Sequence, residues 1–290
     1  MNLKVISFYK YVHIQQPEAL SESIRSFCRE KGIFGRILIA QEGINAAVSG
    51  EVVAIEKLKD FVLSQALFEG VLFKDQETDQ QTYHKLVVRV KLEIVAFGYP
   101  VDMKNRAEHV SPEQLKAWLD NKEDIVLLDA RNNYEFKVGK FKGAQVLPIE
   151  TFREFPKQIA KLKDKKDKKI VMYCTGGVRC EKSSAFLKEE GFKDVYQLEG
   201  GIINFINKFP NTYFEGGCFV FDDRIVSHVT EDTPISECEH CGEECEDYIN
   251  CHNLDCDNLV ISCEKCRVMY NKTCSQECMT APRQRKGVSG

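Results

Sequence analysis

The chain has 290 residues, of which 43% are hydrophobic, and a formal net charge of −4. This length predicts two or three packed domains, and the charge excludes a general attraction to nucleic acid, so any RNA contact must come from a local basic patch. Because no signal-peptide core and no apolar run of membrane length are found, we expect a soluble cytoplasmic protein without membrane contact. In a reducing compartment, 13 cysteines indicate catalysis and metal binding rather than disulfides.

The first domain is expected at residues 1–104. Alternating apolar residues and helix stop signals predict the order β-α-β-β-α-β, which indicates a ferredoxin-like α+β sandwich. The expected strands cover residues 3–11, 36–40, 46–49 and 85–97, and the expected helices cover residues 17–31 and 52–65. This fold carries many functions, so the shape alone predicts none.

The second domain is expected at residues 105–215, as a parallel α/β sheet. Buried strands alternate with helices, and Ser111 is suited to cap the first helix. The expected strands cover residues 125–128, 170–173 and 195–198, and the expected helices cover residues 112–120, 151–163 and 181–190. Asp129 and Cys174 each follow a strand, so we expect a ligand at the carboxyl edge where both lie.

Cys174 lies at the end of an apolar strand, and Gly176 and Gly177 follow it before a helix begins. Two glycines allow a tight loop whose N–H groups surround the thiol, and a helix N-terminus favours an anion. This arrangement predicts a reactive thiolate. The alternative is a buried structural cysteine, which is chemically inert.

The loop resembles that of the rhodanese family, whose cysteine and arginine are spaced C-x4-R, as Cys174 and Arg179 are. The phosphatase spacing C-x5-R is not met, because Cys180 stands at that position. Further matches are Asp129-Ala130-Arg131, Glu135 and Glu199-Gly200-Gly201. The resemblance implies that Asp129 and Arg131 hold the active site together and that Glu135 supports it. The alternative for Asp129 and Arg131 is an ordinary ion pair.

The third region, residues 216–290, holds nine cysteines between Cys238 and Cys278. Pairs spaced by two to four residues suit tetrahedral zinc, and eight cysteines make two structural zinc sites. The eight expected ligands are Cys238, Cys241, Cys251, Cys256, Cys263, Cys266, Cys274 and Cys278. Cys245 is the spare. His240 and His252 are expected to be bystanders, with replacement of a cysteine ligand as the alternative, and spacing does not decide which pairs share a metal. The alternative is a disordered cysteine-rich tail.

Over nearly its whole length, the chain resembles the tRNA wobble-uridine hydroxylase family. The resemblance rests on Gly35–Asn45, the loop Cys174–Lys182, Phe219–Arg224 and the cysteine cluster. It implies an oxidoreductase that modifies tRNA at the anticodon region, converting the wobble uridine to 5-hydroxyuridine with molecular oxygen as co-substrate. The sequence contains no recognisable flavin site or iron triad to activate oxygen.

Two mechanisms remain open. A Cys174 thiolate can add to C6 of uracil, with Arg179 and the loop N–H groups stabilising the negative charge. Alternatively, Cys174 is oxidised and Cys180 acts as the resolving thiol. The alternative for Cys180 is a structural role, in which it fills space at the start of the helix as a small apolar side chain.

Two other functions also remain open. The rhodanese loop would serve a sulfurtransferase that carries a persulfide on Cys174, and the flanking domains would serve a non-catalytic RNA-binding adaptor. Seven lysines between Lys157 and Lys169 form a basic run, which fits an RNA phosphate track or a solvated surface.

Overall fold

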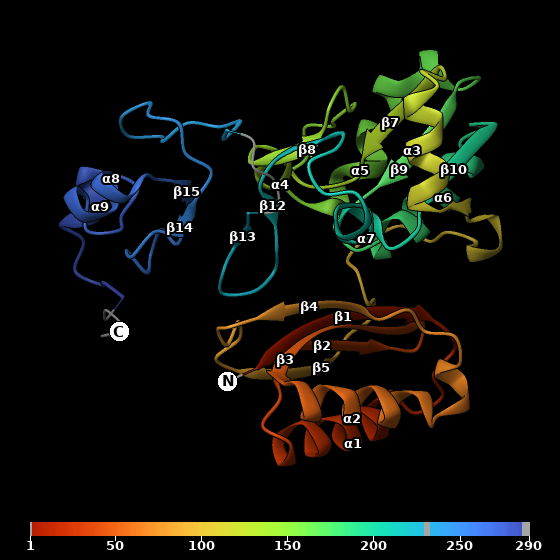
Figure 1. Cartoon of the computed structure of the whole chain (residues 1–290), viewed down its shortest axis with the longest axis horizontal. Coiled ribbons are helices and arrows are strands. Elements are labelled where there is room, and N and C mark those ends of the chain that lie inside the picture. The colour runs from red at the N-terminus through yellow and green to blue at the C-terminus, as the bar shows by residue number, and fades with distance from the viewer. Residues whose placement is uncertain (1, 229–232, 286–290) are drawn as a thin grey trace.

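The computed structural model describes residues 2–228 and 233–285. Its described residues form an N-terminal sheet covered by two helices, a central α/β domain and a C-terminal unit with short elements (Figure 1). Within these residues, no helix has the length and apolar character that crossing a bilayer requires.

The N-terminal domain has the expected sandwich. Its sheet has the strand order β4-β1-β3-β2-β5, and both helices lie on one face while the other face turns toward the central domain (Figure 1). Apolar side chains of the helices, such as Ile24 and Leu58, are buried against Phe8 and Ile37. The elements are β1 (Leu3–Tyr11), α1 (Pro17–Glu30), β2 (Phe34–Ala40), β3 (Gly43–Glu51), α2 (Val52–Leu63), β4 (Lys74–Thr78) and β5 (Leu86–Val90).

The expected long strand over residues 85–97 was wrong in extent and position. Only β5 forms, and it adds to the sheet in parallel with β2. The strand that completes the sandwich beside β1 is β4, whose sequence KDQET has no apolar alternation. The residues after β5 leave the sheet, because the backbone of Ile94 is bound by Glu42 and Asn45 instead of by a strand.

The central domain contains the expected parallel sheet, with strand order β6-β10-β9-β7 and parallel pairing throughout. Strand β9 lies between two neighbours and is almost fully buried. Cys174 therefore follows an inner strand of this sheet. The elements are β6 (Glu108–Val110), α3 (Pro112–Asp120), β7 (Ile125–Asp129), α4 (Asn133–Phe136), β9 (Lys169–Tyr173), α6 (Val178–Glu189), β10 (Asp194–Leu198) and α7 (Gly201–Lys208).

The helix expected over residues 151–163 is not one α-helix. It consists of the 3-10 turn η3 (Phe152–Glu154), the short helix α5 (Phe155–Gln158) and the 3-10 turn η4 (Ile159–Lys165). Pro156 has no N–H for the carbonyl four residues earlier, which interrupts the α-helical hydrogen bonds at the start. The segment still buries its apolar residues, including Phe155 and Leu162.

The C-terminal unit has small two-stranded sheets and short helices. Strand β12 has only two residues, Cys218 and Phe219. Phe219 packs between Tyr134 and Tyr248, with ring centroids at 5.0 and 5.9 Å, and so links this unit to the central domain. The elements are β11 (Phe214–Gly216), which pairs with β8 (Gly139–Phe141), then β12 (Cys218–Phe219), β13 (Val226–Ser227), β14 (Tyr248–Asn250), β15 (Leu259–Ile261), α8 (Glu264–Met269) and α9 (Gln276–Met279).

Candidate active site and metal centres

The Cys174 loop is a tight turn between β9 and α6. Gly177 has a φ of +97° and its N–H donates to the Cys174 Sγ at 3.1 Å. Behind the loop, Gly201 at the start of α7 allows close packing, since a Cβ there would lie 2.4 Å from the Cys174 carbonyl oxygen. The N–H of Ile202 donates to the same oxygen at 3.0 Å. Two glycines thus let the loop and α7 fix the direction of the thiol.

The environment of Cys174 favours the thiolate. Burial opposes ionisation, but a hydrogen bond from the Cys180 thiol, the charge of Arg179 and the backbone N–H groups of Arg179 and Gly177 outweigh it. Together they lower the pKa of Cys174 to about 5, so the group is ionised at neutral pH. Burial and the neighbouring thiolate raise the pKa of Cys180 well above its usual value, so Cys180 remains a protonated donor.

Arg179 is held by Glu135 from the short helix α4. The guanidinium donates Nη1 to Oε2 at 2.5 Å and Nη2 to Oε1 at 2.6 Å. The Thr175 hydroxyl donates to Glu135 Oε1 at 3.0 Å. Burial opposes the charge on Glu135, but Arg179 outweighs it and lowers the pKa of this carboxyl. The Glu135 carboxylate therefore fixes the position of the Arg179 guanidinium.

Asp129 and Arg131 form a second buried pair near the end of β7. Arg131 Nη2 lies 2.7 Å from Asp129 Oδ2, and both side chains are fully buried. The same guanidinium nitrogen donates to the Gly139 carbonyl at 2.6 Å, and the guanidinium lies 5.8 Å from the centre of the Tyr173 ring. These contacts tie the end of β7 to β8, next to the strand that carries Cys174.

The open face of the N-terminal sheet covers the cysteine loop. Tyr11 donates its hydroxyl to the Val178 carbonyl at 3.3 Å, and Lys74 Nζ donates to the Gly176 carbonyl at 3.0 Å. The Tyr9 hydroxyl donates to Glu181 at 2.9 Å. With this cover, Cys174 is only 1% exposed. Sequence reasoning missed these residues because the contacts span more than 100 positions and no motif marks them.

Further buried charges join the two domains. Glu181 accepts hydrogen bonds from Tyr9 and from His109 Nε2, the latter at 3.0 Å. Lys182 lies between Glu42 at 2.8 Å and Glu93 at 2.7 Å. Glu42 belongs to the Gly35–Asn45 segment on which the family resemblance rested. That segment therefore has a structural partner in helix α6, directly after the cysteine loop.

The lysine run lies at the surface over η4. Four of its members have partners, since Lys165 pairs with Asp164, Lys168 with Asp124 and Lys169 with Glu123, and Lys166 donates to the Glu190 carbonyl. Some members of the run line a cavity of about 440 Å³ beside aromatic rings. The lining includes Tyr99, Phe186, Lys157, Lys163 and Lys166. The fold thus supplies aromatic neighbours that the run itself lacks.

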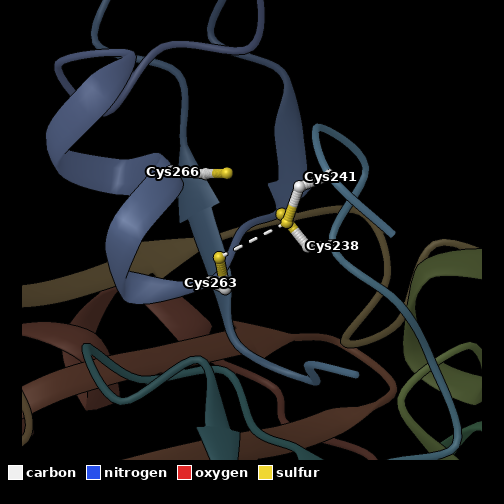
Figure 2. A group of neighbouring side chains, drawn as sticks. All are labelled: Cys238, Cys241, Cys263 and Cys266. Atoms are coloured by element: carbon white, nitrogen blue, oxygen red, sulfur yellow. Dashed lines mark hydrogen bonds between the residues drawn. The ribbon is translucent and has the colours of Figure 1, made fainter. Parts of the chain in front are cut away.

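Eight cysteines gather in two groups of four in the C-terminal unit. Their sulfurs lie within 4.8 Å of one another in each group. Figure 2 shows Cys238, Cys241, Cys263 and Cys266 turned toward a common centre. The second group contains Cys251, Cys256, Cys274 and Cys278. The first and third pairs along the chain share one group, and the second and fourth share the other, a choice that spacing left open.

The spacing of the sulfurs fits a tetrahedral metal. Four thiolates at about 2.3 Å from zinc lie about 3.8 Å apart, and the Cys241–Cys263 and Cys256–Cys274 separations are 3.7 and 3.6 Å. Cys245 lies outside both groups, buried among apolar neighbours. His240 stacks on Tyr270, with centroids 4.0 Å apart. Each group can therefore hold a metal with cysteines alone.

Comparison with known proteins covers all three parts of the chain. Residues 3–94 match a UPF0176 acylphosphatase-like domain, residues 111–208 a rhodanese-like domain and residues 215–279 a rhodanese C-terminal domain. Proteins named tRNA uridine(34) hydroxylase are 41% identical in Cytophaga hutchinsonii (97% of this chain, 91% of the relative), 37% in Chlamydia felis (98% and 89%) and 41% in Streptococcus agalactiae (98% and 90%). As the motifs predicted, the chain belongs to the tRNA uridine(34) hydroxylase family, a family of oxidoreductases.

Proposed function

We propose that this chain hydroxylates uridine 34 of tRNA at C5, with molecular oxygen as co-substrate, and that Cys174 carries the chemistry. The observation that supports this most is the ionised thiol in a loop of N–H donors, within a chain that matches its relatives over nearly full length. A thiolate is the reactive form of cysteine toward both uracil and oxidants. The tRNA substrate would also place the protein in the cytoplasm.

The first route begins with addition of the Cys174 thiolate to C6 of uracil. The new S–C6 bond moves the electron pair of the C5–C6 double bond onto C5 and O4, where the loop N–H groups and nearby cations stabilise it. C5 then forms its bond to oxygen, and loss of the C5 proton with release of the thiolate restores the double bond. One atom of O2 enters the base and the other leaves as water, with two electrons from an external donor.

In the second route, one atom of O2 enters uracil at C5 and the other stays on Cys174 as a sulfenic acid. The Cys180 thiol then displaces that oxygen as water and forms a disulfide with Cys174, which an external thiol reduces to restore both cysteines. The side chain of Cys180 neighbours that of Cys174 and lowers its pKa, and a resolving role requires such a neighbouring thiol. The same contact also serves the first route, in which Cys180 stabilises the thiolate as a donor. Asp129 and Arg131 act in either route by holding β7 and β8 beneath the loop.

For tRNA binding, we propose the face formed by the lysine run and the neighbouring rings of Tyr99 and Phe186. Lysines supply phosphate contacts, and aromatic rings stack on unpaired bases such as those of an anticodon loop. The two four-cysteine groups would hold structural zinc, which closes the C-terminal unit around metals instead of a large apolar core.

Nucleoside analysis of tRNA from cells that lack the protein tests the proposal. Loss of 5-hydroxyuridine and its derivatives, restored by the wild-type gene and not by a Cys174→Ser variant, is the expected result. Loss of thiolated nucleosides instead would identify a sulfurtransferase. An unchanged nucleoside profile would favour an RNA-binding adaptor.

A further inference from the structure

The Cys174 thiolate lies in a buried loop whose motif arginine is already paired. Arg179 shares two hydrogen bonds with the buried carboxylate of Glu135, so the net charge of that pair is near zero. A carboxylate this close offsets much of the field of the guanidinium at the thiol. A buried anion needs compensating positive charge or hydrogen bonds, and another cation near the loop therefore gains importance.

We infer that Lys74, on strand β4 of the N-terminal domain, is a positioning residue of the cysteine site. Its ammonium supplies a second positive charge beside the Cys174 thiolate, and its hydrogen bond to Gly176 fixes the loop. The assignment rests on the proposed role of Cys174, but the ionisation of that thiol can be measured without tRNA.

The pleat of the N-terminal sheet directs Lys74 to the loop. Along β1, Ile6 and Phe8 are buried against the helices, whereas Tyr9 and Tyr11 contact the cysteine loop and the start of α6. Strand β4 pairs with β1 so that Lys74 lies opposite Ser7, and its Nζ is 5.0 Å from the centre of the Tyr9 ring. Side chains alternate between the two faces of a strand, so Lys74 shares the face of Tyr9.

The charge of Lys74 is directed at the loop and not at a carboxylate. Within residues 2–228 and 233–285, no ion pair joins Lys74 to an acidic side chain, and its hydrogen bond goes to the Gly176 carbonyl at 3.0 Å. Asp75, the next residue, points to the other face and pairs with Lys4 and Lys59. Lys4 and Lys59 are thus neutralised by a carboxylate, while Lys74 is not.

The electrostatics agree with this geometry. Burial lowers the pKa of Lys74 to about 8, and the Cys174 thiolate acts in the opposite direction. At pH 7 most of the lysine is still protonated. The other charged or titratable groups around the thiolate are Arg179, Cys180 and Glu181 on α6, Glu135 behind Arg179, and Tyr9 and Tyr11 on β1.

Because Lys74 belongs to a different domain from Cys174, the thiolate is most stable while the two domains are docked. Cys174 is 1% exposed, and the face that carries Lys74 and Tyr9 forms part of its cover. Docking of the N-terminal domain and activation of the thiol are therefore coupled.

The test compares the full-length protein with Lys74→Met, Lys74→Arg and Lys57→Met. Lys57 is an exposed lysine on α2, which covers the opposite face of the same sheet. The rate of iodoacetamide labelling of the Cys174 peptide is measured by mass spectrometry between pH 4 and 9, on the folded proteins, as verified by circular dichroism. In Lys74→Met the midpoint should rise by about one pH unit, while Lys74→Arg and Lys57→Met stay near wild type.

An unchanged midpoint in folded Lys74→Met protein would overturn the assignment. If Lys74→Met does not fold, Lys74→Gln keeps a polar donor without the charge and should show the same rise; an unchanged midpoint there also overturns it. Wobble-uridine hydroxylation is measured in parallel, and kcat should fall at least fivefold in Lys74→Met with partial recovery in Lys74→Arg. If no variant and no wild-type protein hydroxylates tRNA, the proposed function fails, while the labelling result still decides the role of Lys74.

Discussion

Arg179 and Glu135 form a bidentate ion pair in the interior of the central domain, with both hydrogen bonds at or below 2.6 Å. The arginine of the C-x4-R motif is therefore fixed as a brace between the cysteine loop and α4. Thr175 binds the same carboxylate, so the loop is attached to α4 at two positions. Arg179 thus holds the geometry of the loop, and its charge also lowers the pKa of Cys174 together with Cys180 and the loop N–H groups.

The first prediction concerns the ionisation of Cys174. Its pKa is lowered to about 5, so the thiolate fraction and the labelling rate should be constant above about pH 6 and fall as the pH drops through 5. Limiting iodoacetamide near pH 6 should label Cys174 before the other cysteines that bind no metal. Peptide mass spectrometry measures this order, and labelling of Cys28 ahead of Cys174 would contradict it.

The second prediction concerns the brace. Glu135→Gln leaves a buried guanidinium without its counter-charge and should lower the free energy of unfolding by about 3–5 kcal/mol, as measured by urea denaturation. Glu113→Gln is the matched control, because Glu113 forms an exposed pair with Lys208 at 2.6 Å. Surface pairs contribute about 1 kcal/mol or less. Equal losses in the two variants would refute the bracing role.

Much of this site was predictable from sequence because its parts are local. The strand, the two glycines and the helix start around Cys174 follow one another, and short-range rules describe them. The cysteines of the two four-cysteine groups were predictable as pairs, but which pairs share a group was not. Cys238 and Cys241 meet Cys263 and Cys266 only because the chain folds back across the second group.

The cover over the cysteine could not be predicted. The composition of strand β4 is that of a polar loop. Asp75 forms an ion pair on one face of the strand, and Lys74 donates to a loop carbonyl on the other. Its place in the sheet is set by pairing with β1, and its contact with Gly176 is set by domain docking. Neither the pairing with β1 nor the docking of the domains produces a periodic pattern in the sequence. In addition, the apolar run after β5 suggested a strand that does not form.

The third prediction concerns the metal. Purified protein should contain about two zinc ions per chain, and Cys251→Ser should reduce this to about one because it opens one four-cysteine site. Cys245→Ser is the matched control, since Cys245 lies outside both groups, and it should retain about two. Metal analysis by mass spectrometry measures the ratio. Equal zinc content in Cys251→Ser and wild type would exclude the assignment.

The fourth prediction concerns tRNA binding. Lys157→Glu with Lys163→Glu, beside Tyr99 and Phe186, should weaken tRNA binding and reduce the slope of log K against log salt by about 1.4, because two phosphate contacts are lost. In the control, Lys31 at the end of α1 and Lys57 on α2 receive the same change to Glu. Filter binding at several salt concentrations gives the slope. An unchanged slope in the first variant would show that the lysine run is a solvated surface and not a phosphate-binding face.

The last prediction separates the two mechanisms at Cys180. This residue is fully buried and protonated, and it donates a hydrogen bond to Cys174. Cys180→Ser keeps a hydroxyl donor but removes the resolving thiol, whereas Cys180→Ala removes both. If Cys180 only stabilises the thiolate, Cys180→Ser should retain most of the hydroxylation and a labelling midpoint near pH 5, and Cys180→Ala should raise the midpoint.

If Cys180 instead resolves an oxidised sulfur, both variants should stop after one turnover, and an added thiol should restore them. Single-turnover and steady-state hydroxylation of the same tRNA measure the difference. Cys174→Ser should be inactive under either mechanism, because a serine in this loop has no adjacent general base. Wild-type activity in Cys174→Ser protein would show that the loop is not the catalytic centre. Neither proposed role of Cys180 would then hold.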